Sequence, residues 1–191
     1  MFPVFLKLQG RRVVVVGAGP VAASKLDALL AAGAGVTVVA PEIDPEIVGR
    51  DVTLVRREFE DADLDGAWYV VAAAPADVNR QVGLAAEERR VFVNAVDDPL
   101  HATAYMGGIV RRDGVTLAIS TEGRAPAIAG LLREALDSWL PVDLDEWMAV
   151  ADGARREWRE EGVPMERRRP ELLDRLNKLY EGRRPLGPGG R

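Results

Sequence analysis

The chain contains no cysteine and only one histidine, and these two absences exclude several kinds of chemistry. Without cysteine, the protein forms no disulfide and has neither a thiolate metal ligand nor a cysteine nucleophile. Ordinary zinc sites need several histidine or cysteine ligands, so we predict no metal site. The single histidine, His101, has the chemistry of a proton carrier, but a position in a surface loop is the simpler interpretation.

Long apolar runs and a basic charge balance are also missing. No apolar stretch reaches the roughly 18 residues that suggest a membrane helix. The first residues lack the basic region and apolar core of a secretory signal, which favours a cytoplasmic protein. The net charge is −5, whereas nucleic-acid-binding domains usually present a basic face. We therefore expect neither a membrane nor a nucleic acid as a partner.

The sequence does contain a glycine turn in the setting that a dinucleotide-binding fold requires. Four consecutive valines within residues 12–16 indicate a strand that is buried on both faces. The turn Gly17-Ala18-Gly19 follows, and then apolar residues at helical spacing over residues 21–32. A second apolar strand is predicted over residues 36–40. This order of strand, glycine turn, helix and strand is typical of the dinucleotide fingerprint.

Four residues around the turn are predicted to contact the cofactor. Gly17 permits the turn, and Gly19 lets the backbone approach a pyrophosphate without a Cβ in the way. The helix start offers N–H groups to the phosphates. Pro20 lacks this donor, so Val21 is expected to make more of the backbone contact. A P-loop is excluded because Lys25 does not follow a glycine. The alternative is a glycine turn that binds nothing.

The acidic residue expected at the cofactor ribose is shifted past the second strand. Pro41 and Glu42 follow this strand, and Glu42 is the candidate ligand of a ribose hydroxyl. No arginine occurs in the loop before Arg50, which favours NAD over NADP. The sequence predicts NAD and leaves NADP open.

The rest of the chain predicts a Rossmann-like α/β domain followed by smaller segments. Further strands are expected over residues 52–55, 68–74 and 91–95, with a helix over residues 78–90, and alternating apolar residues over 2–8 suggest an edge strand. After these come a hairpin with an Asp113-Gly114 turn, a helix over residues 127–140 and charged helices split at Gly162–Pro164. The predicted parts are a parallel-sheet domain over residues 1–106, a small α+β hairpin–helix segment over 107–141, a helical C-terminal segment over 142–182 and a disordered tail over 183–191.

Two loops are predicted to meet at the carboxyl ends of the strands, where parallel sheets bind ligands. After the fourth strand, the small residues between Ala72 and Asn79 leave room for a nicotinamide ribose, with Ala73 and Asn79 as contacts. After the fifth strand, Asp97 is a candidate general base or metal-positioning group. On local sequence alone, a simple turn before Pro99 is the better interpretation of Asp97.

The loop of residues 120–126 is a second candidate site. Its hydroxyl groups, its glycine, its arginine and the helix that follows are suited to binding an anion. Simple capping of the helix explains the same residues equally well. The side chains concerned are Ser120, Thr121, Gly123 and Arg124.

These motifs together resemble the precorrin-2 dehydrogenase / sirohydrochlorin ferrochelatase family, which also forms the N-terminal half of sirohaem synthase. The matching segments keep their order over about residues 3–140; they are residues 3–6, 16–25, 31–34, 72–79, 94–97 and 120–134. The resemblance implies NAD-dependent oxidation of precorrin-2 to sirohydrochlorin, with iron insertion in some members. It also implies a homodimer formed through the hairpin and the helix after it.

The resemblance assigns roles to individual residues. Asp97 takes the position of the family's acid/base or metal-handling aspartate. Ser120 and Thr121 take the positions of a serine pair in the substrate loop, with threonine as a departure, and Glu122 stands where a small residue is common. Because precorrin-2 is an acidic tetrapyrrole, Arg111 and Arg124 suit its carboxylates. The dinucleotide contacts fall on Pro20, Val21, Pro41 and Glu42.

Two other functions stay open at this point. A regulatory module that senses NAD would share the glycine turn and bind the dinucleotide without turnover. A chelatase that no longer oxidises its substrate would need the loops but not the hydride acceptor. The sequence alone does not decide whether iron or cobalt is inserted.

Overall fold

The computed structural model describes residues 1–181, so the tail predicted over residues 183–191 lies outside the described residues. The chain divides into two compact units. The first unit contains residues 1–106 together with the loop of residues 120–125. The second contains residues 107–119 and the chain from residue 126 onwards.

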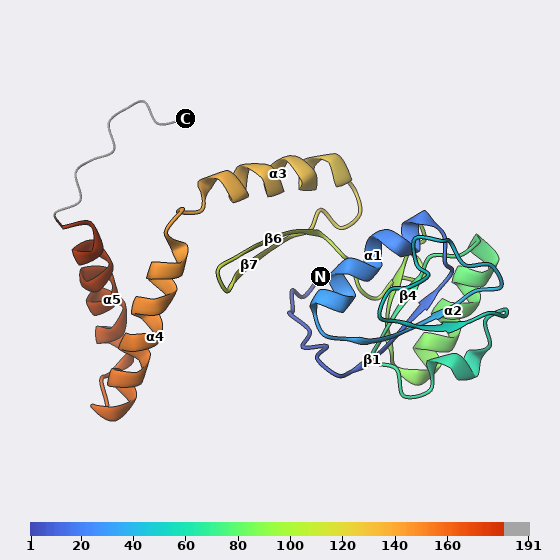
Figure 1. Ribbon diagram of the computed structural model, residues 1–191, viewed down its shortest axis with the longest axis horizontal. Coiled ribbons are helices and arrows are strands. Elements are labelled where there is room, and N and C mark those ends of the chain that lie inside the picture. The colour runs from blue at the N-terminus through green and yellow to red at the C-terminus, as the bar shows by residue number, and fades with distance from the viewer. Residues whose placement is uncertain (182–191) are drawn as a thin grey trace. The chain divides into compact units, whose positions relative to one another are not determined.

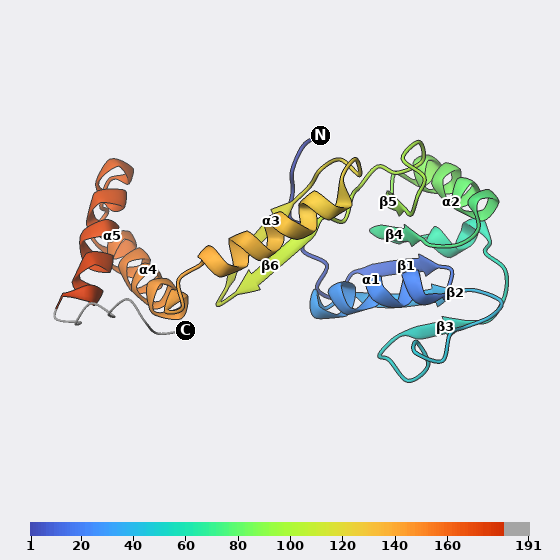
Figure 2. The ribbon, with the colours of Figure 1, turned by 90° about the horizontal axis from the view of Figure 1, so that it is seen from above.

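A five-stranded parallel sheet forms the centre of the first unit (Figure 2). The strand order across the sheet is β3-β2-β1-β4-β5, and all four neighbouring pairs are parallel. This sheet is the Rossmann-like α/β architecture that the sequence predicts. The strands are β1 (Arg12–Val16), β2 (Gly35–Val39), β3 (Thr53–Val55), β4 (Tyr69–Ala72) and β5 (Phe92–Ala95).

The helices α1 (Pro20–Ala31) and α2 (Ala76–Arg89) cover opposite faces of this sheet (Figure 1). The four valines of β1 alternate between two separate cores. The first and third pack with Leu26 of α1, and the second and fourth pack with Val82 of α2. This division follows from the strand period, because successive side chains point to opposite faces. Each buried valine contributes about 1.5–3 kcal/mol relative to an exposed one.

A short 3-10 helix, η1 (Asp61–Leu64), lies in the connection between β3 and β4. Its buried Asp63 accepts hydrogen bonds from both terminal nitrogens of Arg57, at 2.6 and 2.8 Å, and from the Glu60 N–H at 2.9 Å. The Arg57 hydrogen bond, with a smaller one from the backbone, lowers the pKa of the Asp63 carboxyl although burial acts in the opposite direction. This pair holds the connection together, and Arg12 of β1, which donates to the Asp63 carbonyl at 3.0 Å, joins the connection to the sheet.

The edge strand expected over residues 2–8 is wrong, because no strand forms there. Phe2 and Val4 are exposed, and only Leu8 at the end of the alternating run is buried. The Arg11 N–H donates to the Leu8 carbonyl, so a turn separates this segment from β1. An alternating pattern needs a neighbouring strand to pair with, and the five strands of the sheet leave this segment unpaired.

The second unit begins with the hairpin β6 (Gly108–Arg112) and β7 (Val115–Ile119), which pair antiparallel. Asp113 and Gly114 both have positive φ, as the favoured two-residue hairpin turn requires. The helix α3 (Pro126–Trp139) packs on β6. Arg112 ties the hairpin to this helix region, since it donates to the Leu140 carbonyl at 3.0 Å and to Asp137 at 2.7 Å.

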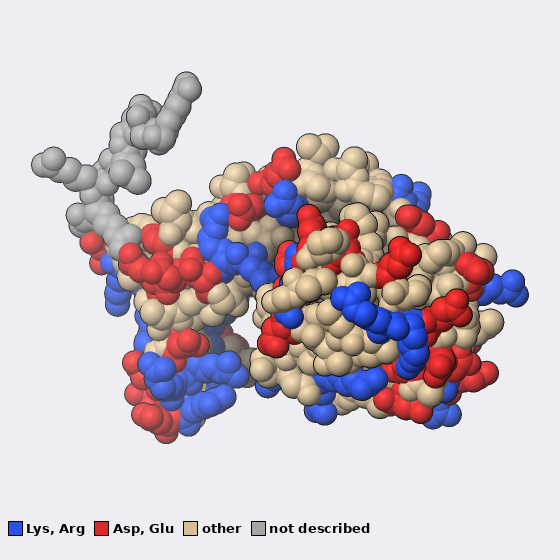
Figure 3. All heavy atoms as spheres, turned by 45° about the vertical axis from the view of Figure 1, so that its right-hand side comes forward, with Lys and Arg blue, Asp and Glu red and all other residues tan. Residues whose placement is uncertain are grey.

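Two antiparallel helices, α4 (Leu144–Glu160) and α5 (Met165–Tyr180), complete the described chain, and the break between them lies where the sequence predicts it. Arg175 of α5 forms ion pairs with Glu157 of α4 and with Glu171. Figure 3 shows acidic and basic side chains intermixed over these helices. Among residues 1–181, no helix combines the length and the apolar character that crossing a membrane requires.

Candidate functional site

The two glycines of the turn between β1 and α1 are needed for different reasons. Gly17 has φ +95°, and a Cβ there would lie 2.2 Å from the carbonyl oxygen of Ala73. Only glycine therefore fits at this position, where the turn after β1 lies against the backbone that follows β4. Gly19 precedes α1 with φ −87°, and a Cβ there would meet nothing within 4 Å. The space beside Gly19 is open to a ligand.

The start of α1 faces this open space with groups suited to phosphate. The first turn of a helix leaves N–H groups without helical partners, and Pro20 at the start has none to offer. Val21, the next residue, is 47% exposed and lies in the wall of the cavity described below. The absence of a Cβ at Gly19 and the partial positive charge of the helix start fit the pyrophosphate of a dinucleotide.

The loop after β2 lies against the glycine turn. The Asp44 N–H donates to the Ala18 carbonyl at 3.0 Å and holds the loop in place. Glu42 is exposed in this loop and lines neither of the two cavities described below. Arg50, the first arginine after β2, donates to the Glu46 carbonyl at 2.8 Å and is ion-paired with Asp27 of α1. This arginine is already occupied by contacts within the protein.

A cavity of about 370 Å³ lies at the carboxyl ends of β4 and β5. It brings together residues from three separate segments of the chain: the start of α1, the connection from β4 into the first turn of α2, and the loop after β5. Val21, Ala73, Asn79 and Asp97, all predicted as site residues, lie in its wall. The complete lining is Val21, Ala73, Ala74, Ala76, Asn79, Val96, Asp97 and Asp98.

Asn79 holds the walls of this cavity together. Its side chain is buried and accepts a hydrogen bond from the Ala74 N–H at 3.0 Å, and its amide donates to the Val96 carbonyl at 3.3 Å. Both ends of the amide are therefore used within the protein. The geometry makes Asn79 a positioning residue for the loops after β4 and β5.

Asp97 lies on a loop whose anchors are buried. The residue has φ +57°, a left-handed conformation that aspartate tolerates better than most residues. Before it, the buried Asn94 donates to the Ala104 carbonyl at 3.1 Å, and Thr103 accepts from the Val93 N–H at 2.9 Å. These contacts fix the end of β5, so the backbone presents the exposed Asp97 at the cavity wall.

The sequence interpretation missed the contact between Asp98 and His101. The His101 Nδ1 lies 2.6 Å from a carboxylate oxygen of Asp98, and the His101 N–H donates to the same side chain at 3.3 Å. The histidine also packs closely on α2, where a Cβ at Gly83 would lie 2.6 Å from its Cβ. The sequence did offer a signal for this contact. Asp98 stands three positions before the only histidine of the chain, shortly after a predicted strand.

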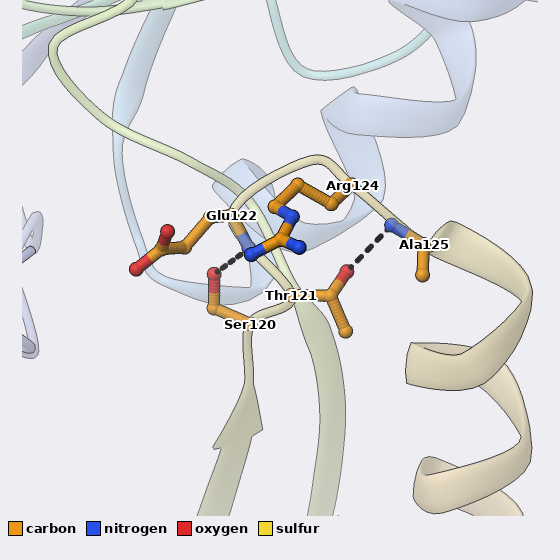
Figure 4. A pocket seen from close by; sticks show the side chains of 5 residues that line it. All are labelled: Ser120, Thr121, Glu122, Arg124 and Ala125. Carbon is orange, nitrogen blue, oxygen red and sulfur yellow. Dashed lines mark hydrogen bonds between the residues drawn. The ribbon is translucent and has the colours of Figure 1, made fainter.

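The loop of residues 120–125 forms a second, more open depression of about 480 Å³ (Figure 4). The Arg124 N–H donates to the Thr121 carbonyl at 2.9 Å, and the two residues between them, Glu122 and Gly123, both have positive φ. This is the geometry of a type I′ turn. Its lining residues are Ser120, Thr121, Glu122, Arg124 and Ala125.

The two hydroxyl groups of this loop serve its own backbone. Ser120 Oγ accepts from the Glu122 N–H at 3.2 Å, and Thr121 Oγ1 accepts from the Ala125 N–H at 3.2 Å. These contacts support the capping interpretation. The group left for an anion is Arg124, which is exposed, forms no ion pair within the described chain, and extends back across the loop (Figure 4).

Two of the predicted substrate contacts, Arg111 and Gly123, line neither cavity. Arg111 is an exposed residue of β6 in the second unit and lines neither cavity. Gly123 lies beside the ring of Tyr105, in ordinary contact distance. Within residues 1–181, no group of three or more histidine, aspartate or glutamate side chains is arranged to hold a metal ion.

A protein family described as "Putative NAD(P)-binding" matches residues 4–108, which contain the whole parallel sheet. The chain belongs to this family. The match assigns a nicotinamide dinucleotide to the fold, and the open Gly19 cradle fits such a cofactor.

Among named relatives, the chain is similar to siroheme synthases, as the sequence resemblance implies. It is 41% identical over 158 residues to siroheme synthase 3 of Aeromonas hydrophila, which covers 80% of this chain and 34% of the relative. It is 38% identical over 172 residues to the siroheme synthase of Photorhabdus laumondii, which covers 87% of this chain and 37% of the relative. The chain therefore spans about a third of the length of these relatives.

The solved structure of SirC, a precorrin-2 dehydrogenase, has the same fold. The similarity has a TM-score of 0.70 at 26% sequence identity, and it covers 91% of this chain and 88% of the SirC chain. It extends beyond the parallel sheet, because the sheet and its helices end before residue 107. The architecture of parallel sheet, hairpin and helices is thus shared with a dehydrogenase of similar length.

Proposed function

We propose that this chain oxidises precorrin-2 to sirohydrochlorin, with NAD as the hydride acceptor. The proposal is supported above all by the cavity at the ends of β4 and β5, which both Asp97 and Val21 of α1 line. The likeness to SirC over nearly the full length of both chains supports the same reaction. The matched part of this chain spans about a third of the relatives called siroheme synthases, and the proposal covers only the dehydrogenase step.

The reaction removes a hydride and a proton from the substrate. Bound NAD supplies the hydride acceptor. The protein's task is to hold the reacting carbon against the cofactor and to receive the proton. Asp97 is the residue proposed for the proton, because its carboxylate lies at the cavity wall and is exposed. Asn79 acts on the reaction through the loops that it positions.

The depression at residues 120–125 is proposed as the site for carboxylates of the substrate. Arg124 is the cationic side chain there, and charge-assisted hydrogen bonds to carboxylates are the stronger kind. The hydroxyl protons of Ser120 and Thr121 remain available as donors, since both oxygens act as acceptors toward the backbone. Gly123 and Arg111 are retained as proposed substrate contacts on the family resemblance.

NAD is proposed over NADP because of the loop after β2. The 2′-phosphate of NADP requires a nearby free cation, whereas Glu42 is an exposed carboxylate in that loop. Arg50 is engaged with Asp27 and the Glu46 carbonyl. The exposed Pro41 and Glu42 are therefore proposed to face the adenosine ribose.

A homodimer in the cytoplasm is part of this proposal. The helix α3 exposes several large apolar side chains, a pattern that supports burial against a second copy. Light scattering on the purified protein tests this, and Leu131→Glu is expected to shift a dimer toward the monomer. The exposed apolar side chains of α3 are Ile128, Leu131, Leu132 and Trp139.

The decisive experiment gives the purified protein precorrin-2 with NAD and, in parallel, with NADP. NADH and sirohydrochlorin should form together, and the reaction with NAD should be faster. Asp97→Ala is expected to lower turnover at least tenfold while NAD still binds, because general base catalysis contributes roughly a hundredfold or more. Binding of NAD without any turnover by the unaltered protein would instead favour a regulatory module.

A further inference from the structure

All the charged side chains in the wall of the cavity at the ends of β4 and β5 are acidic. Asp97 and Asp98 are its two ionisable side chains, and no lysine or arginine lines it. The other polar side chain, Asn79, has both ends of its amide engaged with backbone. The rest of the wall consists of valine and alanine. A positively charged group entering this cavity would find two carboxylates and no competing cation.

We propose that Asp97 and Asp98 make this cavity select the oxidised nicotinamide cofactor over the reduced one. This inference rests on the proposed function, in which the pyrophosphate lies at Gly19 and the adenosine ribose faces Glu42 after β2. In the strand order β3-β2-β1-β4-β5, the adenosine half then lies on the β2 side of β1. The nicotinamide half extends to the β4 side, where the cavity is.

The selection follows from the charge of the nicotinamide ring. The ring carries a positive charge in NAD and none in NADH, whereas the two phosphates are the same in both forms. Repulsion between the carboxylates and the phosphates therefore cancels in the ratio of the two affinities. The valine and alanine side chains of the wall add no charge that would offset the remaining attraction. Hydride transfer removes this attraction and favours release of the reduced cofactor.

The two carboxylates are not equivalent. Asp98 is held by His101 at 2.6 Å, and α2 presents the uncharged Gly83 to the histidine, with Arg80 and Glu87 one turn away on either side. Both carboxylate oxygens of Asp98 are engaged, one by the His101 N–H and the other by the imidazole. Asp97 makes no side-chain hydrogen bond or ion pair within the described chain. The larger share of the selection is therefore assigned to Asp97.

The test measures the dissociation constants of NAD and NADH for the full chain by titration calorimetry. The unaltered protein should bind NAD more tightly than NADH. Asp97→Asn should reduce this preference roughly three- to tenfold, the scale of one charge about 6 Å away in a partly screened site. Asp98→Asn should reduce it less. Asp51→Asn, an equal charge change before β3 at the far edge of the sheet, should leave it unchanged.

The binding of NADH reports whether each variant keeps its site. An unchanged preference in both cavity variants, with NADH still bound, would overturn the inference. Equal weakening of both cofactor forms would also overturn it, because that result indicates lost shape and not lost charge. If the unaltered protein binds neither form, the proposed function itself fails. Added salt should lower the preference of the unaltered protein and have less effect on Asp97→Asn.

Discussion

The side-chain amide of Asn79 donates a hydrogen bond to the carbonyl oxygen of Val96 at 3.3 Å, which joins α2 to the loop that carries Asp97. The same side chain accepts from the Ala74 N–H at 3.0 Å. One buried residue thus sets the distance between the loops that follow two neighbouring strands. The proposed acid/base residue depends on a neighbour that need not touch the substrate.

Replacing this asparagine should weaken both the fold and the site. Asn79→Ala leaves the Ala74 N–H and the Val96 carbonyl without partners, at a cost of about 1–3 kcal/mol in the free energy of unfolding. Affinity for NAD should fall as well, because the cavity wall loosens. Urea denaturation and cofactor titration measure the two effects. Asn177→Ala, at an exposed position of α5, should stay within about 0.5 kcal/mol of the unaltered protein.

The two glycines of the turn offer a matched pair of variants. Gly17→Ala places a Cβ 2.2 Å from the Ala73 carbonyl oxygen at positive φ, so the protein should lose several kcal/mol of stability or fail to fold. Gly19→Ala meets no protein atom and should fold normally. Its new methyl group occupies the space proposed for the pyrophosphate, so affinity for NAD should drop by about tenfold or more. Normal NAD binding by the folded Gly19→Ala protein would argue against the cradle.

The Arg57–Asp63 pair predicts a pH dependence of stability. Because Arg57 lowers the pKa of Asp63 in the folded protein, the contribution of this carboxylate is complete above its unfolded pKa of about 4. It is lost as the pH falls through the lower folded pKa. Asp63→Asn should therefore destabilise the protein at pH 7 by about 1–3 kcal/mol, through its weakened hydrogen bonds.

The difference between Asp63→Asn and the unaltered protein should shrink as the pH falls below about 4. Urea denaturation over a series of pH values measures it. The exposed Asp51→Asn serves as the control and should show little difference at any pH. A difference for Asp63→Asn that stays constant into acid would mean that packing, and not the charge pair, explains the loss.

The turn at residues 121–124 predicts a variant that gains stability. Glu122 has φ +56°, a left-handed conformation that costs residues other than glycine about 1 kcal/mol. Glu122→Gly should recover part of this cost, although glycine also adds freedom to the unfolded chain. It should also lower the KM for the acidic substrate by removing a negative charge from the proposed site.

Glu122→Gln separates the two effects, because it removes the charge and keeps the strained backbone. It should lower the KM without raising the melting temperature. If Glu122→Gln leaves the KM unchanged, the depression does not receive the carboxylates of the substrate.

The parallel sheet was predictable because its strands are short apolar runs separated by clear turn signals. The valines of β1 predict a buried strand, and the glycines after them predict a tight turn. The hairpin was equally clear, since Asp113 and Gly114 are the residues that its turn requires. The segment at Phe2 failed because alternation reports a half-buried strand only when a partner strand exists, and partners are set by the whole sheet.

The sequence predicted which residues lie at the candidate site, but not which hydrogen bonds they form. The rule that ligands bind at the carboxyl ends of strands drew attention to Asn79 and Asp97. It did not show that the Asn79 amide is used by the backbone, nor that the hydroxyls of Ser120 and Thr121 cap their own loop. The Asn79–Val96 bond joins residues 17 positions apart, and their distance depends on the packed fold. The bonds of Ser120 and Thr121 are local, and they decide for the capping interpretation that the sequence leaves open. The contact between Asp98 and His101 is local too, and the spacing of the two residues could have indicated it.

The loop of residues 120–125 belongs to the first unit although the chain enters it from β7 and leaves it through α3. A shortened protein that stops at Met106 would retain every parallel strand and the glycine turn. We expect it to bind the dinucleotide and to keep Asp97, but to lack Arg124 and the proposed contact with the substrate. The hairpin therefore has a second consequence: it carries the chain from the cofactor-binding residues to the loop that is proposed to hold the substrate.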